Sequence, residues 1–453
     1  MSTSSPAGVW WIRQATAERR AGQGDTVVRV NPVTDLPDVW PTTGWPTTAW
    51  PPAAVRTAMG GDLPRMVLKN SALVHNVDLM SRFCAEAGVE LAPHAKTHLS
   101  EELCRRQLAA GAWAMTAATT AQVRQLVTFG VPRILHANVL VDSAAIEFVA
   151  ETFLAEHPVA EYLCYIDSVE GAELLERELG RLQPARRLRV LLEVGFTGGR
   201  TGTRSAADAL ALGRRVAKSG LLELAGVAGF EGLIPLAGGA FPPGARELLV
   251  AMRELVVTLH DEGLFMCIPI VTAGGSSYFD LVVTELGPGA VDFETICVLR
   301  SGCYITHDHG VYERTSPFGL ARDDNPATRF EPAFELWASV LSEPEPGLVI
   351  VGFGRREAPT DDRLPVLLGV LDALSPDATT ETTTATTTDT TSWVITGVND
   401  HHAFLRVPTE TRLSPGTVLR FGISHPCGAF DRWRTIALLD DYGCTIGAIT
   451  PAL

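Results

Sequence analysis

The segment LAPHAKTHLS holds a single lysine, Lys96, which lies between His94 and His98. Val89–Ala92 has the pattern of a short strand and Thr97–Arg106 that of a helix, so we expect Lys96 at the carboxyl end of a strand. A lysine in a pocket at such a position loses hydration, which lowers its pKa and makes it a nucleophile and a base. The alternative is a surface lysine in a strand–helix loop.

A glycine-rich turn follows a predicted apolar strand at Thr272–Ser276, TAGGS. Glycine lets the backbone approach an anion closely, and the N-terminus of the following helix favours negative charge. Gly274, Gly275 and Ser276 are therefore candidates for a phosphate-binding turn, with Tyr278 close enough to contribute. An ordinary strand–helix turn is the alternative.

Near the C-terminus, His425 and Cys427 are two residues apart in the segment SHPCGAFDRW. On an extended chain, side chains at this spacing point the same way, and imidazole and thiolate are both good donors to Zn²⁺. Catalytic zinc usually has three protein ligands and a water molecule, so this pair alone is short of a full ligand set. The alternative is a buried cysteine beside an unrelated histidine.

A scaffold for these segments is predicted between residues 64 and 300. Short apolar strands alternate there with amphipathic helices about eight times, from Arg65–Leu68 to Ile268–Thr272. Repeats of this length favour a closed (β/α)8 TIM barrel, which keeps its chemistry at the carboxyl ends of the strands. A doubly wound open sheet is the alternative, but no GxGxxG motif opens it.

The rest of the chain divides around this barrel. After about Gly310, short strand-like runs separated by turn residues predict an antiparallel β domain. We expect an N-terminal arm over residues 1–62 that packs on the β domain or at a subunit contact, a barrel over residues 63–310 and a β domain over residues 311–453. Residues 379–391, TTETTTATTTDTT, are of low complexity and are expected to be a solvated loop.

Composition excludes several classes of protein. A chain of 453 residues has room for two or three domains, and its formal net charge of −15 argues against nucleic-acid and anionic-membrane partners. No apolar run is long enough to span a membrane, and the first residues lack a signal-peptide pattern. Eight cysteines without a CxxC pair favour reduced thiols and a cytoplasmic location.

The motif P-H-x-K-T-H around Lys96 resembles the cofactor lysine of fold type III, alanine racemase-like pyridoxal-phosphate enzymes, specifically the D-serine dehydratase/D-threonine aldolase group. The resemblance covers most of residues 62–453 and implies that Lys96 carries pyridoxal 5′-phosphate as a Schiff base, with His94 beside the cofactor. The segment EVGFTGGRTG resembles a strand end that brings Arg200 near the cofactor or its substrate. The resemblance also assigns Gly274, Gly275 and Ser276 to the cofactor phosphate.

The C-terminal motif separates two branches of that group. Relatives of the dehydratase kind have a His-x-Cys that binds zinc, whereas those of the aldolase kind typically have His-x-Asp. The resemblance therefore makes His425 and Cys427 zinc ligands and favours a dehydratase. It also implies a homodimer in which the β domain of one subunit covers the barrel mouth of the other.

Other polar segments have a less definite assignment. Val351-Gly352 and Arg355 depart from the residues usual in relatives, which leaves the substrate open. His307, Asp308 and His309 could bind a metal, or they could be structural residues of a domain junction. Two further segments resemble motifs of relatives without a clear role: Phe230-Glu231-Gly232, and Asn399–His402, in which His402 matches a family histidine.

From these residues we expect a pyridoxal-phosphate lyase that acts on a D-β-hydroxy amino acid and releases a 2-oxo acid and ammonia, as a D-serine dehydratase does. Lys96 would take the Cα proton, and zinc would polarise the β-hydroxyl group. The alternatives are a metal-dependent D-threonine aldolase, a non-catalytic pyridoxal-phosphate protein and a racemase. A racemase needs a second base, for which no suitable context surrounds Tyr304, Tyr312 or Tyr442.

Overall fold

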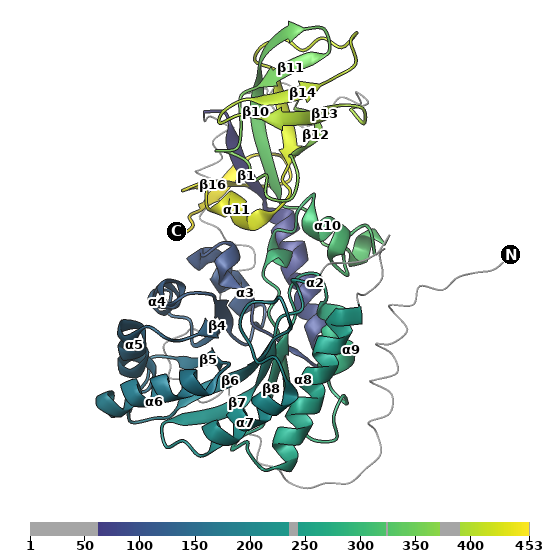
Figure 1. The fold of residues 1–453 in the computed structure, drawn as a ribbon. Coiled ribbons are helices and arrows are strands. Elements are labelled where there is room, and N and C mark those ends of the chain that lie inside the picture. The colour runs from purple at the N-terminus through teal and green to yellow at the C-terminus, as the bar shows by residue number, and fades with distance from the viewer. Residues whose placement is uncertain (1–61, 235–242, 323–324, 372–389, 453) are drawn as a thin grey trace, which may run out of the picture. The chain divides into compact units, whose positions relative to one another are not determined.

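The computed structural model describes residues 62–234, 243–322, 325–371 and 390–452 (Figure 1). The predicted N-terminal arm lies outside the described residues except for Asp62. The threonine-rich segment also lies outside them, apart from Thr390 and Thr391.

Eight parallel strands form the predicted barrel, in the order β2-β9-β8-β7-β6-β5-β4-β3. Backbone hydrogen bonds from Trp113 to Leu91 and from Thr116 to Pro93 join the two ends of this order, so the barrel closes. The strands are β2 (Glu90–Leu91), β3 (Met115–Ala117), β4 (Arg133–Val139), β5 (Glu161–Ile166), β6 (Leu188–Val194), β7 (Leu222–Gly229), β8 (Ile270–Ala273) and β9 (Ile296–Leu299).

Helices follow the strands and cover the outside of the barrel (Figure 1). Side chains of Thr119, Asp142, Ser168 and Ser205 accept N–H bonds at the starts of α4 to α7, which satisfies donors that a helix leaves open. The helices are α2 (Asn70–Ala87), α3 (Glu101–Ala109), α4 (Thr120–Thr128), α5 (Ser143–Phe153), α6 (Val169–Leu182), α7 (Ala206–Ala217), α8 (Pro243–Asp261) and α9 (Phe279–Leu286).

Two layers of apolar side chains stabilise the barrel. Inward-facing residues such as Leu135, Leu163 and Leu191 form a cluster of their own inside the strands, and the larger cluster packs between strands and helices. This arrangement fills the barrel interior with side chains, so chemistry is confined to the loops at its ends.

The second sheet is the predicted C-terminal β domain. Its main path is β13-β14-β11-β10-β1-β16-β17, and β15 pairs with β10 and β12. Its strands are β1 (Arg65–Lys69), β10 (Phe334–Glu345), β11 (Leu348–Val351), β12 (Val366–Leu371), β13 (Val394–Val398), β14 (Ala403–Arg406), β15 (Val418–Gly422), β16 (Ile436–Leu439) and β17 (Thr445–Ile449).

The prediction that Arg65–Leu68 begins the barrel is wrong. This strand, β1, pairs antiparallel with β10 and parallel with β16, and its purple ribbon lies among the green and yellow strands in Figure 1. The eighth barrel strand is instead β9, Ile296–Leu299, which lies in a segment where we predicted no strand. A short apolar run that is buried on both faces has the same sequence pattern in the barrel and in the β domain. The pattern therefore could not show to which sheet β1 or β9 belongs.

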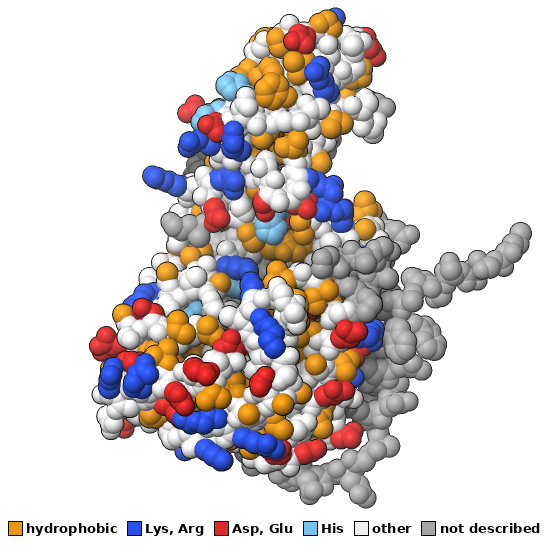
Figure 2. Space-filling model, viewed as in Figure 1, with side chains coloured by type: hydrophobic (Ala, Val, Ile, Leu, Met, Phe, Trp, Pro, Cys, Tyr) orange, Lys and Arg blue, Asp and Glu red, His pale blue; other side chains and the backbone are white. Residues whose placement is uncertain are grey.

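In the described residues, five short helical segments lie in the loops between strands, and several of them carry candidate residues. They are η1 (Ala95–Thr97), η2 (Cys303–Ile305), α10 (Val311–Thr315), η3 (Pro326–Thr328) and α11 (Pro426–Phe430). Within the described ranges, no helix combines the length and apolar character needed to cross a membrane. On the face shown in Figure 2, Lys and Arg side chains are interspersed with Asp and Glu side chains.

Candidate functional site

The sheet order brings the candidate segments to one rim of the barrel. Because β2, β9, β8, β7 and β6 are consecutive neighbours, the segments that follow their carboxyl ends lie side by side. These segments contain Lys96 after β2, Cys303 after β9, the TAGGS turn at β8, Phe230-Glu231 after β7 and Arg200 after β6. The rim therefore gathers segments that span more than 200 residues of sequence.

Lys96 lies in the 3-10 turn η1 with an exposed side chain, while Ala95 and Thr97 on either side of it are buried. Its amine forms no hydrogen bond or ion pair with the described residues. Burial, followed by the charges of Lys96 and Arg300, lowers the pKa of His94 well below its usual value. His94 is therefore neutral at physiological pH, and its Nδ1 atom is buried without a hydrogen-bond partner among the described residues.

His98 has a structural position. Its Nε2 atom lies 3.1 Å from Gln107 Oε1, and its Nδ1 atom accepts the N–H of Ser100. Gln107 in turn donates to the hydroxyl of Tyr304. Burial lowers the pKa of His98 to about 4, so the ring is neutral and anchors the Lys96 turn to α3 and η2.

His425 and Cys427 meet a third donor, Cys303, at the junction of the barrel and the β domain. One ligand atom from each of the three residues lies within 4.8 Å of the other two, and the two Sγ atoms are 3.6 Å apart. Thr97 Oγ1 lies 3.5 Å from Cys303 Sγ and 3.7 Å from Cys427 Sγ. The donor cluster therefore contacts the residue next to Lys96.

The local structure of the His-x-Cys pair differs from the predicted extended chain. His425 is the N-cap residue of α11, Pro426 starts the helix, and Cys427 lies in its first turn. A proline fits this position because it has no N–H that needs an acceptor. Hydrogen bonding from Cys303, together with His425, lowers the pKa of Cys427 well below its usual value, which favours a thiolate.

Cys303 and Arg300 were not among the predicted site residues, because β9, the strand that ends just before them, was not predicted. Arg300 is 4% exposed and donates to Thr272 Oγ1 at 2.6 Å and to the carbonyl oxygen of Gly229 at 2.5 Å. Neither partner carries a charge, so the guanidinium of Arg300 is buried without a hydrogen-bonded carboxylate among the described residues. The four apolar residues ICVL before Arg300 were the signal that could have located both side chains.

Several polar side chains face one another at the mouth of the barrel. Burial raises the pKa of Tyr165 to about 12 and raises the pKa of Glu193, and the charges of Arg200 and Arg300 act on both groups. The Tyr165 hydroxyl and Glu193 Oε2 are buried without a hydrogen-bond partner among the described residues. Unsatisfied buried polar atoms at one mouth are a sign of a binding site for a polar ligand.

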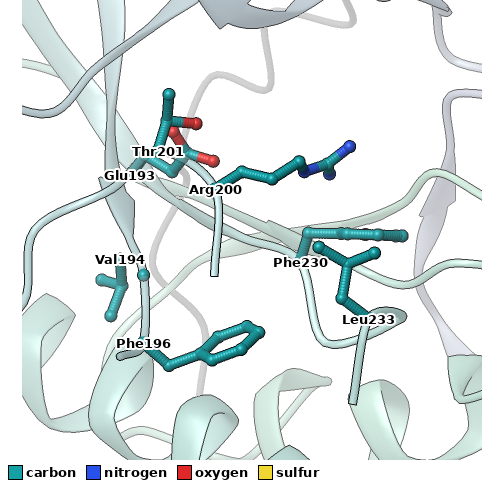
Figure 3. Close-up of a pocket in the computed structure, with 8 residues that line it drawn as sticks. Glu193, Val194, Phe196, Arg200, Thr201, Phe230 and Leu233 are labelled. Carbon is teal, nitrogen blue, oxygen red and sulfur yellow. The ribbon is translucent and has the colours of Figure 1, made fainter. Parts of the chain in front are cut away.

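A pocket at this mouth is lined by Glu193, Arg200 and Phe230, among other residues (Figure 3). The guanidinium of Arg200 lies 4.9 Å from the centre of the Phe230 ring, and Figure 3 shows the two side chains next to each other. Arg200 is exposed, so its charge is available to an anionic ligand.

The predicted phosphate-binding turn binds a carboxylate of the chain itself. The backbone N–H groups of Gly274 and Gly275 donate to the two carboxylate oxygens of Glu231, at 3.1 and 3.0 Å, and Glu231 is fully buried. These two N–H groups thus bind a carboxylate, and phosphate binding at this turn stays a prediction. Ser276 is buried beside them, and Tyr278 donates its hydroxyl to the Ile234 carbonyl oxygen instead of facing the turn.

Two other candidate segments bond to groups outside the cluster of three donors. His307 bonds Glu313 at 2.8 Å, and Asp308 Oδ1 accepts the N–H groups of Gly310 and Tyr312, so both stabilise the junction. In the hairpin β13–β14, His401 bonds Glu357 at 2.6 Å, and the adjacent His402 is exposed. In the part of the chain that the structure describes, Cys303, His425 and Cys427 form the only close group of three donors suited to a metal.

Comparison with known proteins finds similarity to a family model and to a curated protein. Residues 333–439 match the family model of a putative serine dehydratase domain. A D-threonine aldolase from Arthrobacter sp is 25% identical over 387 residues, which cover 84% of this chain and 89% of that protein.

Solved structures agree with the fold. The D-threonine aldolase from Filomicrobium marinum has a TM-score of 0.68 at 21% identity, over 86% of this chain and 95% of that one. The D-threo-3-hydroxyaspartate dehydratase from Delftia sp. HT23 has a TM-score of 0.63 at 20% identity, over 86% and 97%. These similarities show that the chain shares the barrel and C-terminal β domain of both proteins.

Proposed function

We propose that this chain, which belongs to the D-serine dehydratase/D-threonine aldolase-like family, is a metal-assisted pyridoxal-phosphate lyase that acts on D-β-hydroxy amino acids. The observation that carries the proposal is the contact between the donor cluster and the Lys96 turn. Thr97 touches both Cys303 and Cys427, so a metal on these donors would lie beside the turn that contains Lys96.

The barrel mouth fits pyridoxal 5′-phosphate in most respects. Lys96 offers an amine without a partner among the described residues, and His94, Tyr165 and Glu193 offer buried polar atoms that lack one. When bound there, the cofactor would supply an electron sink for the charge that develops at the substrate Cα. Lys96 would hold it, with His94 and Arg200 beside it and Gly274, Gly275 and Ser276 at its phosphate.

The glycine turn adds a condition to this proposal. Because Glu231 accepts the N–H bonds of Gly274 and Gly275, the phosphate can use these donors only if the carboxylate releases them. The bonds of Glu231 nevertheless support the turn as an anion site, since a carboxylate and a phosphate seek the same donors.

Different residues of the chain would act on the Cα proton, the carboxylate and the β-hydroxyl group of the substrate. Lys96 would remove the proton from the substrate Cα, and Arg200 would bind the substrate carboxylate. His94 stays neutral because of its burial, so it adds no positive charge that would repel the Lys96 ammonium. A zinc ion on His425 and Cys427 would polarise the β-hydroxyl group.

Dehydration is our first candidate for the reaction, because Cys427 occupies the position at which relatives of the aldolase kind typically have aspartate. Loss of the β-hydroxyl group then leads to a 2-oxo acid and ammonia. Aldol cleavage is the second candidate, since the curated relative with 25% identity is a D-threonine aldolase. It would release glycine and an aldehyde.

Product analysis separates these two reactions. The purified protein, loaded with pyridoxal phosphate, would be incubated with D-serine, D-threonine and D-threo-3-hydroxyaspartate, with and without a chelator. Ammonia with pyruvate from D-serine, lost with the chelator, supports the dehydratase. Glycine and acetaldehyde from D-threonine support the aldolase. Absence of both kinds of product with all three substrates contradicts the proposed lyase.

Lysine is scarce enough in this chain to test the cofactor attachment directly. The chain has only two other lysines: Lys69, which lies 3.8 Å from Glu335, and Lys218, which is exposed at the end of α7. Borohydride reduction followed by peptide mapping should find the cofactor on Lys96. Lys96→Ala should abolish turnover, whereas the matched Lys218→Ala variant should keep it. Full turnover in Lys96→Ala would refute the assignment.

We also propose a homodimer, on the family resemblance alone. Size-exclusion chromatography with light scattering measures the mass directly, and a monomer at micromolar concentration would refute it.

A further inference from the structure

We infer that Cys303 is the third protein ligand of the metal, which makes the centre a Cys2His site built from both halves of the chain. This inference deepens the proposed function and rests on its metal. It adds a ligand that the His-x-Cys motif does not contain.

Chain topology explains why Cys303 reaches the motif. Strand β9 ends at Leu299, and the chain then turns through Gly302 into η2, which starts at Cys303. Gly302 packs so closely on the Lys96 loop that an added Cβ atom would lie 2.6 Å from the His94 carbonyl oxygen. This close approach fixes the position of Cys303 beside Thr97, where α11 presents Cys427.

The distance between the two sulfur atoms fits shared ligation. Zinc binds thiolates at about 2.3 Å in tetrahedral geometry, which separates two sulfur ligands by about 3.8 Å. The observed Sγ–Sγ distance is 3.6 Å. A disulfide bond needs about 2.05 Å, so the pair in this structure is two separate thiols.

Cys303 also differs from the other buried cysteines. Cys84, Cys104, Cys164 and Cys297 are members of the main apolar core, in which a thiol behaves as a small hydrophobic group. Cys303 is equally buried but is not a member of that core, and its sulfur contacts Thr97 and Cys427. The surroundings of Cys303 are those of a ligand atom.

A three-ligand centre has a chemical consequence. Two thiolates and one imidazole leave the fourth tetrahedral position open, as in catalytic zinc sites with a Cys2His ligand set. A substrate hydroxyl group could take this position. Because η2 follows the barrel and α11 belongs to the β domain, the metal would also link these two parts.

Cobalt substitution tests the number of thiolates. The full-length protein loaded with pyridoxal phosphate would be prepared under reducing conditions, freed of metal and titrated with Co²⁺. The thiolate-to-cobalt charge-transfer band should fall to about half its wild-type intensity per bound ion in Cys303→Ser and in Cys427→Ser. The control Cys444→Ser, whose cysteine lies outside the cluster, should keep the full band. Loss of a supporting group around a metal costs about 10–100-fold in affinity, so loss of a ligand should weaken Co²⁺ binding by about 100-fold or more.

A second measurement needs no variant. X-ray absorption of the Zn²⁺-loaded wild-type protein should find two sulfur neighbours at about 2.3 Å. One sulfur neighbour, or an unchanged cobalt band in a folded Cys303→Ser variant, would overturn the inference. A protein that binds neither Co²⁺ nor Zn²⁺ would overturn both the inference and the metal-assisted function. One sulfur neighbour in a protein that still forms chelator-sensitive products would overturn the role of Cys303 alone.

Discussion

Replacing Gly302 with alanine should push the carboxyl end of β9 away from the loop that holds Lys96. The added Cβ atom would lie 2.6 Å from the His94 carbonyl oxygen and 3.0 Å from Thr97 Oγ1. Ordinary contact begins at 3.4 Å, so the backbone must move by 0.8 Å, the difference between 3.4 and 2.6 Å. Gly302 has a φ of −116°, which alanine adopts freely, so the effect is one of space alone.

The magnitude follows from this displacement. Extra atoms in a well-packed region typically cost about 1–3 kcal/mol of stability. A shift of about 1 Å in an active site can lower the rate about 100-fold, so we expect turnover to fall roughly 10- to 100-fold. Both Lys96 and Cys303 lie beside the displaced contact, so cofactor attachment and metal affinity should weaken together.

The assay compares Gly302→Ala with Gly220→Ala. An alanine Cβ at Gly220 would meet no atom of the described residues within 4 Å, so this control tests the glycine substitution without the clash. Urea unfolding, product formation from D-β-hydroxy amino acids and Co²⁺ affinity would be measured for both variants. Wild-type stability and turnover in Gly302→Ala would show that the β9 end and the Lys96 loop are not rigidly packed, and would refute this reasoning.

Three further predictions concern the surroundings of the site. Burial raises the pKa of Asp308 from 3.8 to about 6, so between these pH values the folded state holds a proton that the unfolded state releases, and stability should fall by about 2 kcal/mol as the pH rises from 4 to 6. Asp308→Asn should remove this loss in urea unfolding measured at a series of pH values, and an unchanged slope would contradict it. Removal of the metal should lower the free energy of unfolding by about 2.7 kcal/mol if the free metal had been 100-fold above its Kd, and an unfolding midpoint unaffected by a chelator would contradict a metal that links the two parts. Glu231→Ala leaves the Gly274 and Gly275 N–H groups without their acceptor, at a cost of about 1–3 kcal/mol of stability each. Pyridoxal phosphate should therefore raise the thermal unfolding midpoint of this variant more than that of the wild type. An equal rise would argue against a phosphate at this turn.

Local sequence patterns were sufficient for part of the fold and the site. Alternation of apolar strands with amphipathic helices predicted the barrel, and turn-separated strands predicted the β domain, because these periods follow directly from helix and strand geometry. The sequence also indicated three candidate motifs, Lys96, the TAGGS turn and the His-x-Cys pair, since each motif consists of residues that are close together in the chain. Their assignment to a cofactor and a metal depended on resemblance and remains a proposal.

Only the tertiary structure decided which strand belongs to which sheet and which side chains meet. β1 and β9 are both short apolar runs, and their membership depends on hydrogen bonds to strands far away in the sequence. The meeting of Cys303 with Cys427 joins residues 124 positions apart, and the bonds of Glu231 with the glycine turn join residues 43 and 44 positions apart. Such contacts arise from the packing of whole elements, which no local period records, and they are the contacts that turn separate motifs into one site.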